Sequence, residues 1–209
     1  AHAEARALRG GAVPPLEEAQ PRSSRREGDS MVRIEACGHS LKVSSEHFAK
    51  LRLMHERTAA SSTFERDVFQ LLLRYKAIQG PGFQAARGGA AFAALRKAFG
   101  CSMELFASPL NARSIPFCSA FPDTDAPFGS VGSFFDANLD ATLASGSYEA
   151  NPPFVPILVE QMLERMMALL RRAAQLDDEL LFCIIIGASA GTRKHAAWEE
   201  LMRAASGAF

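Results

Sequence analysis

The chain has 209 residues, 48% of them hydrophobic, which is enough to bury the core of one domain with an appendage. Its 23 basic and 23 acidic side chains cancel, which excludes a global positive field that would draw it onto nucleic acid, so such binding would need a local patch. The four cysteines are widely spaced and form no CxxC pair, so the sequence suggests neither a disulfide framework nor a zinc site. The apolar runs are too short to cross a bilayer, and we expect neither a membrane nor a metal partner.

Residues 1–32 are predicted to be a disordered tail. The segment "RGGAVPPLEEAQPRSSRREGDS" mixes Gly, Pro, Ser and both charges without a hydrophobic period. A segment of this composition cannot bury enough apolar surface to offset the entropy of ordering it.

Residues 33–100 are predicted to form a small helical domain. Ser44 or Ser45 can cap a first helix, and Thr63 can cap a second. The second helix shows a strong helical period, with apolar side chains at Phe64, Val68, Leu71, Leu72, Tyr75 and Ile78. A third helix is expected to stop at Gly100.

Residues 101–209 are predicted to form an α/β domain. Five segments are strand candidates, namely "CSMELFA", "PFCSAF", "GSFFD", "GSYEA" and "LLFCIII". An amphipathic helix that Pro156 can open lies between the last two. Strand, helix and strand at this spacing indicate a βαβ crossover, so the helices should pack over a mostly parallel sheet.

Two loops follow strands of this predicted sheet. The first is Phe106, Ala107, Ser108, Pro109, Leu110 and Asn111, and the second is Asn151, Pro152, Pro153 and Phe154. Ligands of parallel α/β sheets bind beyond the carboxyl ends of the strands. If the two strands are neighbours, the loops should line one crevice.

The second loop has the chemistry to hold an exocyclic amine. The nitrogen of an adenine amino group is a weak nucleophile because its lone pair is delocalised into the ring. The Asn151 side-chain oxygen and the Pro152 carbonyl can each accept one N–H and hold the nitrogen toward tetrahedral geometry. Phe154 offers a face for stacking a splayed-out base, worth about 1–3 kcal/mol. The alternative is a strand stopped by prolines, with Phe154 in the core.

Small residues in the first loop would allow the backbone to approach the methionine portion of S-adenosylmethionine, with Asn111 as a polar contact. Asp136 ends a strand candidate and is our choice for gripping ribose hydroxyls. An equal reading makes Asp136 a turn-former, together with Asp123 and Asp125.

Three stretches together, "LFASPLNA", "FCSAFPDTDAPFGSVGSFFD" and "GSYEANPPF", resemble the phosphorylated-CTD-interacting-factor methyltransferases. The resemblance runs from about residue 38 to 186 and includes "LLLRYKAIQG". That family writes N6-methylation onto the cap-adjacent 2′-O-methyladenosine of mRNA. The resemblance implies a Rossmann-like S-adenosylmethionine-dependent methyltransferase sheet preceded by a small helical domain. Because there are only five strand candidates, we expect either a truncated C-terminus or a reduced, inactive copy.

The same resemblance implies roles for individual residues. Asn151, Pro152, Pro153 and Phe154 (the NPPF motif) would form the catalytic loop, and the residues from Phe106 to Pro109 would lie against S-adenosylmethionine. Arg52 and Arg74 would hold the triphosphate of the cap. It also implies a nuclear protein whose partners are the capped 5′ end of mRNA and the phosphorylated C-terminal tail of RNA polymerase II.

Two departures from the family pattern concern recognition of the cap. Pro156 stands where the family has an acidic residue that touches substrate, and residues 187–191 replace a tryptophan-containing stretch. Two alternatives therefore stay open beside the cap-specific enzyme. One is an adenine N6-methyltransferase acting on DNA or internal RNA, and the other is a non-catalytic module that binds RNA or the polymerase tail.

Overall fold

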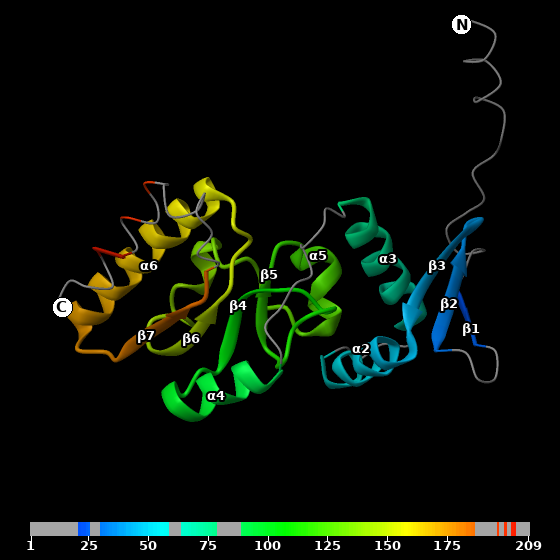
Figure 1. Ribbon diagram of the computed structural model, residues 1–209, viewed down its shortest axis with the longest axis horizontal. Coiled ribbons are helices and arrows are strands. Elements are labelled where there is room, and N and C mark those ends of the chain that lie inside the picture. The colour runs from blue at the N-terminus through cyan, green and yellow to red at the C-terminus, as the bar shows by residue number, and fades with distance from the viewer. Residues whose placement is uncertain are drawn as a thin grey trace, which may run out of the picture.

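The structure is a computed structural model that describes residues 21–25, 30–58, 64–78 and 89–186, together with four single residues near the end of the chain. Figure 1 shows a small sheet with helices beside it at one end of an elongated molecule and a second sheet at the other end. The elements in chain order are β1 (Arg22–Ser24), β2 (Met31–Ala36), β3 (His39–Ser44), α2 (Ser45–Thr58), α3 (Phe64–Ala77), α4 (Gly89–Phe99), β4 (Met103–Ala107), β5 (Phe117–Ser119), α5 (Pro122–Asp125), the 3₁₀ turns η1 (Ala126–Phe128) and η2 (Ala137–Leu139), β6 (Gly146–Ala150), α6 (Pro156–Leu176) and β7 (Leu180–Ile184).

The first sheet is antiparallel, in the order β1-β2-β3, and sequence analysis missed it. In β2 buried Val32 and Ile34 alternate with exposed Arg33 and Glu35, the period expected of a half-buried strand. The predicted tail of residues 1–32 is therefore wrong for the strand residues of β1 and β2, and the predicted helical domain of residues 33–100 begins with strands instead. Residues 1–20 and 26–29 of the predicted tail lie outside the described residues.

The helices of the first half begin where their sequence predicted. α2 starts at Ser45, and α3 starts at Phe64, directly after the predicted cap. The buried residues of α3 include Val68, Leu71 and Tyr75, which lie on one helical face and pack in a core with the first sheet. α4 is followed by Gly100, whose φ of +69° is the left-handed conformation that commonly ends a helix.

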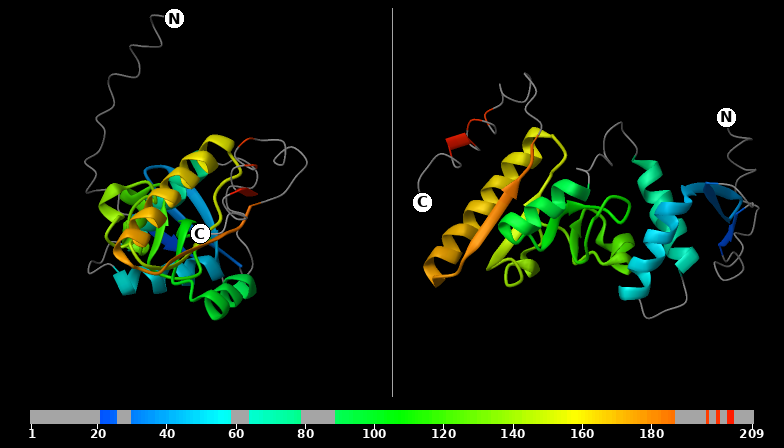
Figure 2. Two further views of the ribbon diagram at one scale, coloured as in Figure 1. Left: turned by 90° about the vertical axis from the view of Figure 1, so that its left-hand side faces the viewer. Right: turned by 60° about the horizontal axis from the view of Figure 1, so that its bottom comes forward.

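The second sheet is parallel, in the order β5-β4-β6-β7, and it confirms the predicted α/β class and βαβ crossover. α6 begins at Pro156 and packs buried Met162 and Met166 against Tyr148 and Ala150 of β6. Figure 1 and the right-hand view of Figure 2 show α6 and α4 on opposite sides of this sheet. The sheet face opposite α6 is therefore covered by the shorter helix α4.

One strand prediction is wrong. The segment "GSFFD" (residues 132–136) forms a turn, in which the backbone N–H of Asp136 donates to the Ser133 carbonyl at 2.9 Å. Phe134 is buried against Phe106, and the Gly132 carbonyl accepts the Ser119 N–H of β5 at 2.9 Å, but the segment is not a strand of either sheet in the described part of the chain. Apolar content predicted the burial correctly and the strand wrongly.

A buried polar contact joins the two halves. The Tyr75 hydroxyl on α3 donates to Asp125 Oδ2 on α5 at 2.7 Å, and both side chains are buried. Burial raises the pKa of Asp125 to about 6, against the opposing effect of hydrogen bonds from Tyr75, Ser119 and Thr124. The hydroxyl of Tyr75 therefore stabilises a carboxylate that water does not reach.

We expect Tyr75→Phe to lower the free energy of unfolding by about 1 kcal/mol at pH 8, because it leaves the ionised Asp125 with one donor fewer. Urea unfolding followed by circular dichroism measures this loss. It should shrink at pH 5, where Asp125 is mostly protonated in the folded protein. An equal loss at both pH values would mean that the hydroxyl acts through packing alone.

Candidate active site

A cavity of about 670 Å³ lies beside the parallel sheet, and its lining includes Leu158 of α6. α4 contributes Phe92 and Leu95 to its wall, and α3 contributes Tyr75. The floor comes from β4 and β6, which are hydrogen-bonded neighbours. Both predicted loops line this cavity, so the expectation that they share one crevice is met by the fold.

The first loop is built as a closed turn. Asn111 Oδ1 accepts the Ser108 backbone N–H at 2.7 Å and the Ser108 hydroxyl at 3.1 Å, while the Asn111 N–H donates back to the Ser108 carbonyl at 3.0 Å. Lys50 Nζ of α2 donates to the Leu110 carbonyl at 3.2 Å. These bonds hold the backbone of Ala107 and Ser108 at the cavity wall.

The second loop presents an unengaged amide. Asn151 lines the cavity at the end of β6, and its side chain makes no hydrogen bond to any residue that the structure describes. Pro152 is buried, whereas Phe154 is 55% exposed at the edge of the same cavity. The Val155 N–H donates to the Pro153 carbonyl at 2.7 Å, which tightens the corner. The alternative that places Phe154 in the core is wrong.

Two buried carboxyl groups face the cavity from adjacent strands. Glu104 on β4 and Glu149 on β6 are register partners, so their side chains lie on the same face of the sheet. Glu104 Oε2 accepts the backbone N–H groups of Arg113 and Ser114. Burial raises the pKa of Glu104, against the effect of these N–H groups and of the Lys50 and Arg113 charges.

Glu149 has no comparable support. Burial, and then the negative charge of Glu104, raise the pKa of Glu149 to about 7. Burial also lowers the pKa of Lys50 to about 8, with a contribution from Arg113 and an opposing one from Glu104. The cavity thus combines a mainly apolar wall with the carboxyl group of Glu149, whose pKa lies near neutral pH.

Aromatic rings form much of the apolar wall. Phe106 contacts Phe134 and Phe135, with ring centroids 5.4 and 5.9 Å apart, and all three line the cavity. Phe121 adds a further ring near Tyr75, at 5.5 Å between centroids. A cavity of this size and lining suits a flat heterocyclic ligand.

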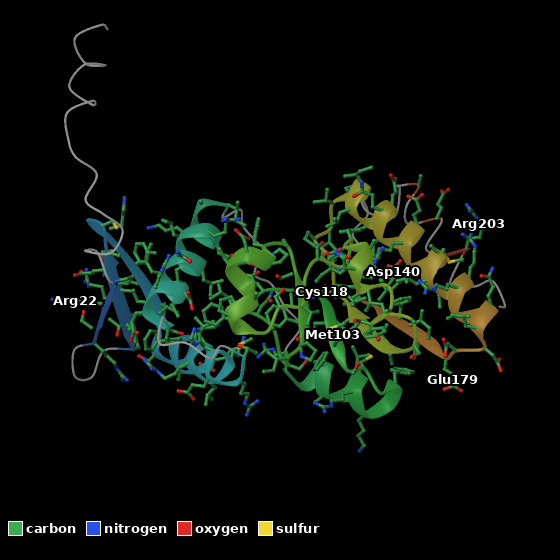
Figure 3. The ribbon with its side chains drawn as sticks, turned by 180° about the vertical axis from the view of Figure 1, so that it is seen from behind. Arg22, Met103, Cys118, Asp140, Glu179 and Arg203 are labelled. Atoms are coloured by element: carbon green, nitrogen blue, oxygen red, sulfur yellow. The ribbon has the colours of Figure 1, made fainter. Side chains whose placement is uncertain are left out.

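Four predicted site residues lie away from the cavity lining, namely Pro109, Asp136, Arg52 and Arg74. Pro109 is fully buried. Asp136 caps η2 by accepting the Asn138 N–H at 2.9 Å, and its carbonyl accepts Arg165 at 2.8 Å, which fits the turn-former reading. Figure 3 shows neighbouring Asp140 close to α6, and Arg165 of α6 pairs with it at 2.6 Å.

The two predicted RNA-binding arginines are already engaged. Arg52 lies over the Phe64 ring at 4.3 Å and pairs with Glu65 at 3.6 Å. Arg74 pairs with Asp123 at 2.7 Å and lies over Phe121. Both retain exposed surface, but each would have to exchange a carboxylate for a phosphate. Residues 187–191, the other segment considered for the cap, lie outside the described residues.

Sequence reasoning missed Glu104 and Glu149. A signal was present, since each is a charged residue inside an otherwise apolar strand, in "MELFA" and "SYEA".

Within the described ranges no group of three His, Cys, Asp or Glu side chains is placed to hold a metal ion. Among those same ranges, no helix is long and apolar enough to span a membrane.

Comparisons with known proteins place this arrangement in context. The sequence model described as the phosphorylated CTD interacting factor 1 WW domain matches residues 40–206. An mRNA (2′-O-methyladenosine-N(6)-)-methyltransferase of Mus musculus is 41% identical over 157 residues, which is 70% of this chain and 22% of the mouse protein. The Homo sapiens protein of the same name is 39% identical over 168 residues, covering 76% of this chain and 23% of its own length. The chain thus spans less than a quarter of the length of these relatives.

Proposed function

This chain belongs to the phosphorylated CTD interacting factor 1 WW domain family, and on that premise we propose that it methylates N6 of adenosine in RNA with S-adenosylmethionine. The substrate we propose is the cap-adjacent 2′-O-methyladenosine of mRNA, and the names of the mouse and human relatives support 2′-O-methyladenosine in mRNA. The observation that carries the proposal is that the unengaged amide of Asn151 and the closed Ser108 loop line one cavity.

The cavity fits the methyl donor by two independent features. Its volume of about 670 Å³ lies within the range of cofactor sites, and small residues at Ala107 and Ser108 leave room for a ligand against the backbone. A buried, unsupported carboxyl at Glu149 marks a polar position without a protein partner in the described chain. We propose that Phe106, Ala107, Ser108 and Asn111 hold the donor, in a Rossmann-like arrangement of the sheet.

In the proposed reaction, bound S-adenosylmethionine supplies an electrophilic methyl group on a sulfonium. Asn151 Oδ1 and the Pro152 carbonyl accept the two N–H hydrogens of the adenine amine, which frees its lone pair to point at the methyl group. The buried Pro152 fixes its carbonyl in place, and small displacements of such a group are costly in rate. After transfer, the nitrogen loses its proton to water, so the loop does not need a strong base.

Phe154 is proposed to stack on the target adenine, which is unpaired in single-stranded RNA. We expect Phe154→Ala to lower kcat/KM for an RNA substrate by about tenfold, because stacking on one ring contributes on the order of 1 kcal/mol or more. The exposed ring contributes little to stability, so the midpoint of thermal unfolding should not change. Phe99→Ala, which removes a similarly exposed ring from α4, is the matched control and should leave kcat/KM unchanged. Equal losses in both variants would assign the effect to general surface chemistry.

Two further assignments rest on the family and its relatives. We propose the phosphorylated C-terminal tail of RNA polymerase II as a protein partner, supported by the family description, and a nuclear location, supported by the proposed mRNA substrate. Cap recognition through Arg52 and Arg74 remains part of the proposal, although both would have to leave their present ion pairs.

Methyl transfer from radiolabelled S-adenosylmethionine tests the proposed function. The full chain is incubated with matched oligonucleotides, one carrying a cap and a 2′-O-methyladenosine and one uncapped, and with a DNA oligonucleotide. Label on N6 of the capped substrate is the expected result. Equal labelling of the uncapped RNA or the DNA would replace the cap-specific function by that of a broader adenine methyltransferase. If no substrate is labelled and the donor does not bind, the chain is a non-catalytic module.

A further inference from the structure

Glu149 is a buried carboxyl group that the fold does not use. The residue is only 5% exposed, and it lines the cavity from β6, two positions before Asn151. Burial and the charge of Glu104 are the influences on the pKa of its carboxyl group, and no described part of the protein donates a hydrogen bond to that group or forms an ion pair with it. An ionised carboxylate in such a place is costly unless something outside the chain compensates it.

The neighbours of Glu149 make the cost larger. Glu104 lies opposite on β4 and carries the same charge, yet it has two backbone N–H donors and the nearby charges of Lys50 and Arg113. On its other side Glu149 has Cys183 of β7 as its register partner, and the cavity lining includes the apolar side chains of Phe106 and Leu95. The described chain therefore satisfies one carboxyl of the pair and leaves the other facing the cavity.

No described part of the chain supplies a compensating group, and a cation or a strong donor that enters with a ligand would do so. S-adenosylmethionine carries two positive centres, its sulfonium and its α-ammonium, whereas the demethylated product retains only the ammonium. The sulfonium lies between carbon groups and the ammonium lies beside the α-carboxylate, and the cavity that Glu149 lines also has apolar rings such as Phe92 and Phe106 in its wall. The adenine ring itself has no positive charge to offer.

We propose that Glu149 is a binding residue for a positively charged centre of the methyl donor, with Glu104 completing the acidic end of the cavity. This assignment rests on the proposed function and adds to it a residue from the strand that leads into the NPPF corner. It gives Glu149 a role in binding the donor that is separate from the role of Asn151 toward the amine.

Isothermal titration of the full chain tests the assignment, with S-adenosylmethionine, S-adenosylhomocysteine and methylthioadenosine as the three ligands. We expect Glu149→Gln to weaken S-adenosylmethionine by about 10- to 100-fold, the usual loss when a hydrogen bond to a charged group is removed. Methylthioadenosine has neither positive centre and should keep its affinity within about twofold. A matching loss for S-adenosylhomocysteine identifies the ammonium as the partner, and an unchanged affinity for it identifies the sulfonium.

A second readout is independent of affinity. The carboxyl of Glu149, whose pKa is raised to about 7, is partly protonated at neutral pH, so a cation binding beside it should expel a proton. Titrations at pH 7 in buffers of different ionisation enthalpy should therefore give different binding enthalpies for wild type, and this difference should be smaller in Glu149→Gln. Glu164→Gln, an exposed change on α6, should match wild type in both readouts.

The two proposals fail in distinguishable ways. A wild-type chain that binds none of the three ligands overturns the proposed function and this assignment together. Unchanged S-adenosylmethionine affinity in Glu149→Gln overturns the assignment alone. So does an equal loss for methylthioadenosine, because that would show a damaged cavity rather than a missing charge.

Discussion

Replacing Asn151 by alanine should abolish measurable methyl transfer while leaving the affinity for S-adenosylmethionine within about twofold of wild type. We expect kcat to fall by about 100- to 1000-fold, the loss seen when one preorganised hydrogen-bonding group is removed from a transition state. The two effects separate because the Asn151 amide is assigned to the substrate amine. The donor is assigned to the loop that Ser108 and Asn111 close.

Single-turnover transfer and isothermal titration together measure this separation. The control is Asn138→Ala, which makes the same chemical change at an exposed position, where only the backbone N–H is bonded to Asp136. Wild-type transfer by Asn151→Ala would remove this residue from the proposed mechanism. A parallel collapse of donor affinity would assign Asn151 to the cofactor instead.

The parallel sheet and its site could largely be anticipated because local signals agree there with long-range packing. Pro156 opens α6 and the apolar period of that helix fixes the face it buries, so the crossover from β6 to β7 follows. Once β4 and β6 are neighbours, parallel geometry brings the carboxyl ends of both strands, and the loops after them, to one edge. The meeting of Ser108 and Asn151 is a consequence of topology.

Other features depend on contacts that a local pattern does not contain. β1 is three residues long and all three residues are exposed, so it has no apolar period that a sequence pattern could detect. Phe134 and Phe135 looked like strand residues, yet their rings pack with Phe106 from within a turn. Arg52 and Arg74 looked free, because the partners that engage them, Glu65 and Asp123, become neighbours only when the helices fold.

Glu149 is the clearest case of a residue whose environment cannot be predicted from local sequence. Its strand reads as apolar except for one carboxyl, but only the register with β4 reveals that Glu104 stands opposite. The local sequence predicts that Glu149 lies on one face of a strand. The free-energy cost of ionising it there comes from burial and from the like charge on a neighbouring strand, and neither is visible in the local sequence.

The cost of ionising the buried Glu149 carboxyl group predicts how the free energy of unfolding depends on pH. The pKa of Glu149 rises from 4.5 to about 7 on folding, so the folded protein holds this proton more tightly than the unfolded chain does. The stabilising contribution of the protonated group is fully present below pH 4.5 and is lost as pH rises through about 7. Glutamine cannot ionise, so Glu149→Gln should escape this loss and become the more stable protein at pH 8, by on the order of 2 kcal/mol after allowance for solvent screening.

Urea unfolding of both proteins between pH 4.5 and 8 measures the effect as a difference that grows with pH. Glu104 and Asp125 also have raised pKa values, but they are present in both proteins, so their direct effects are shared when the two curves are compared. Glu164→Gln should follow wild type at every pH, since that side chain is exposed. A gap between wild type and Glu149→Gln that stays constant with pH would contradict ionisation as the cause. A variant that is more stable at pH 8 but binds S-adenosylmethionine more weakly would show that this buried charge is kept for its ligand at the expense of the fold.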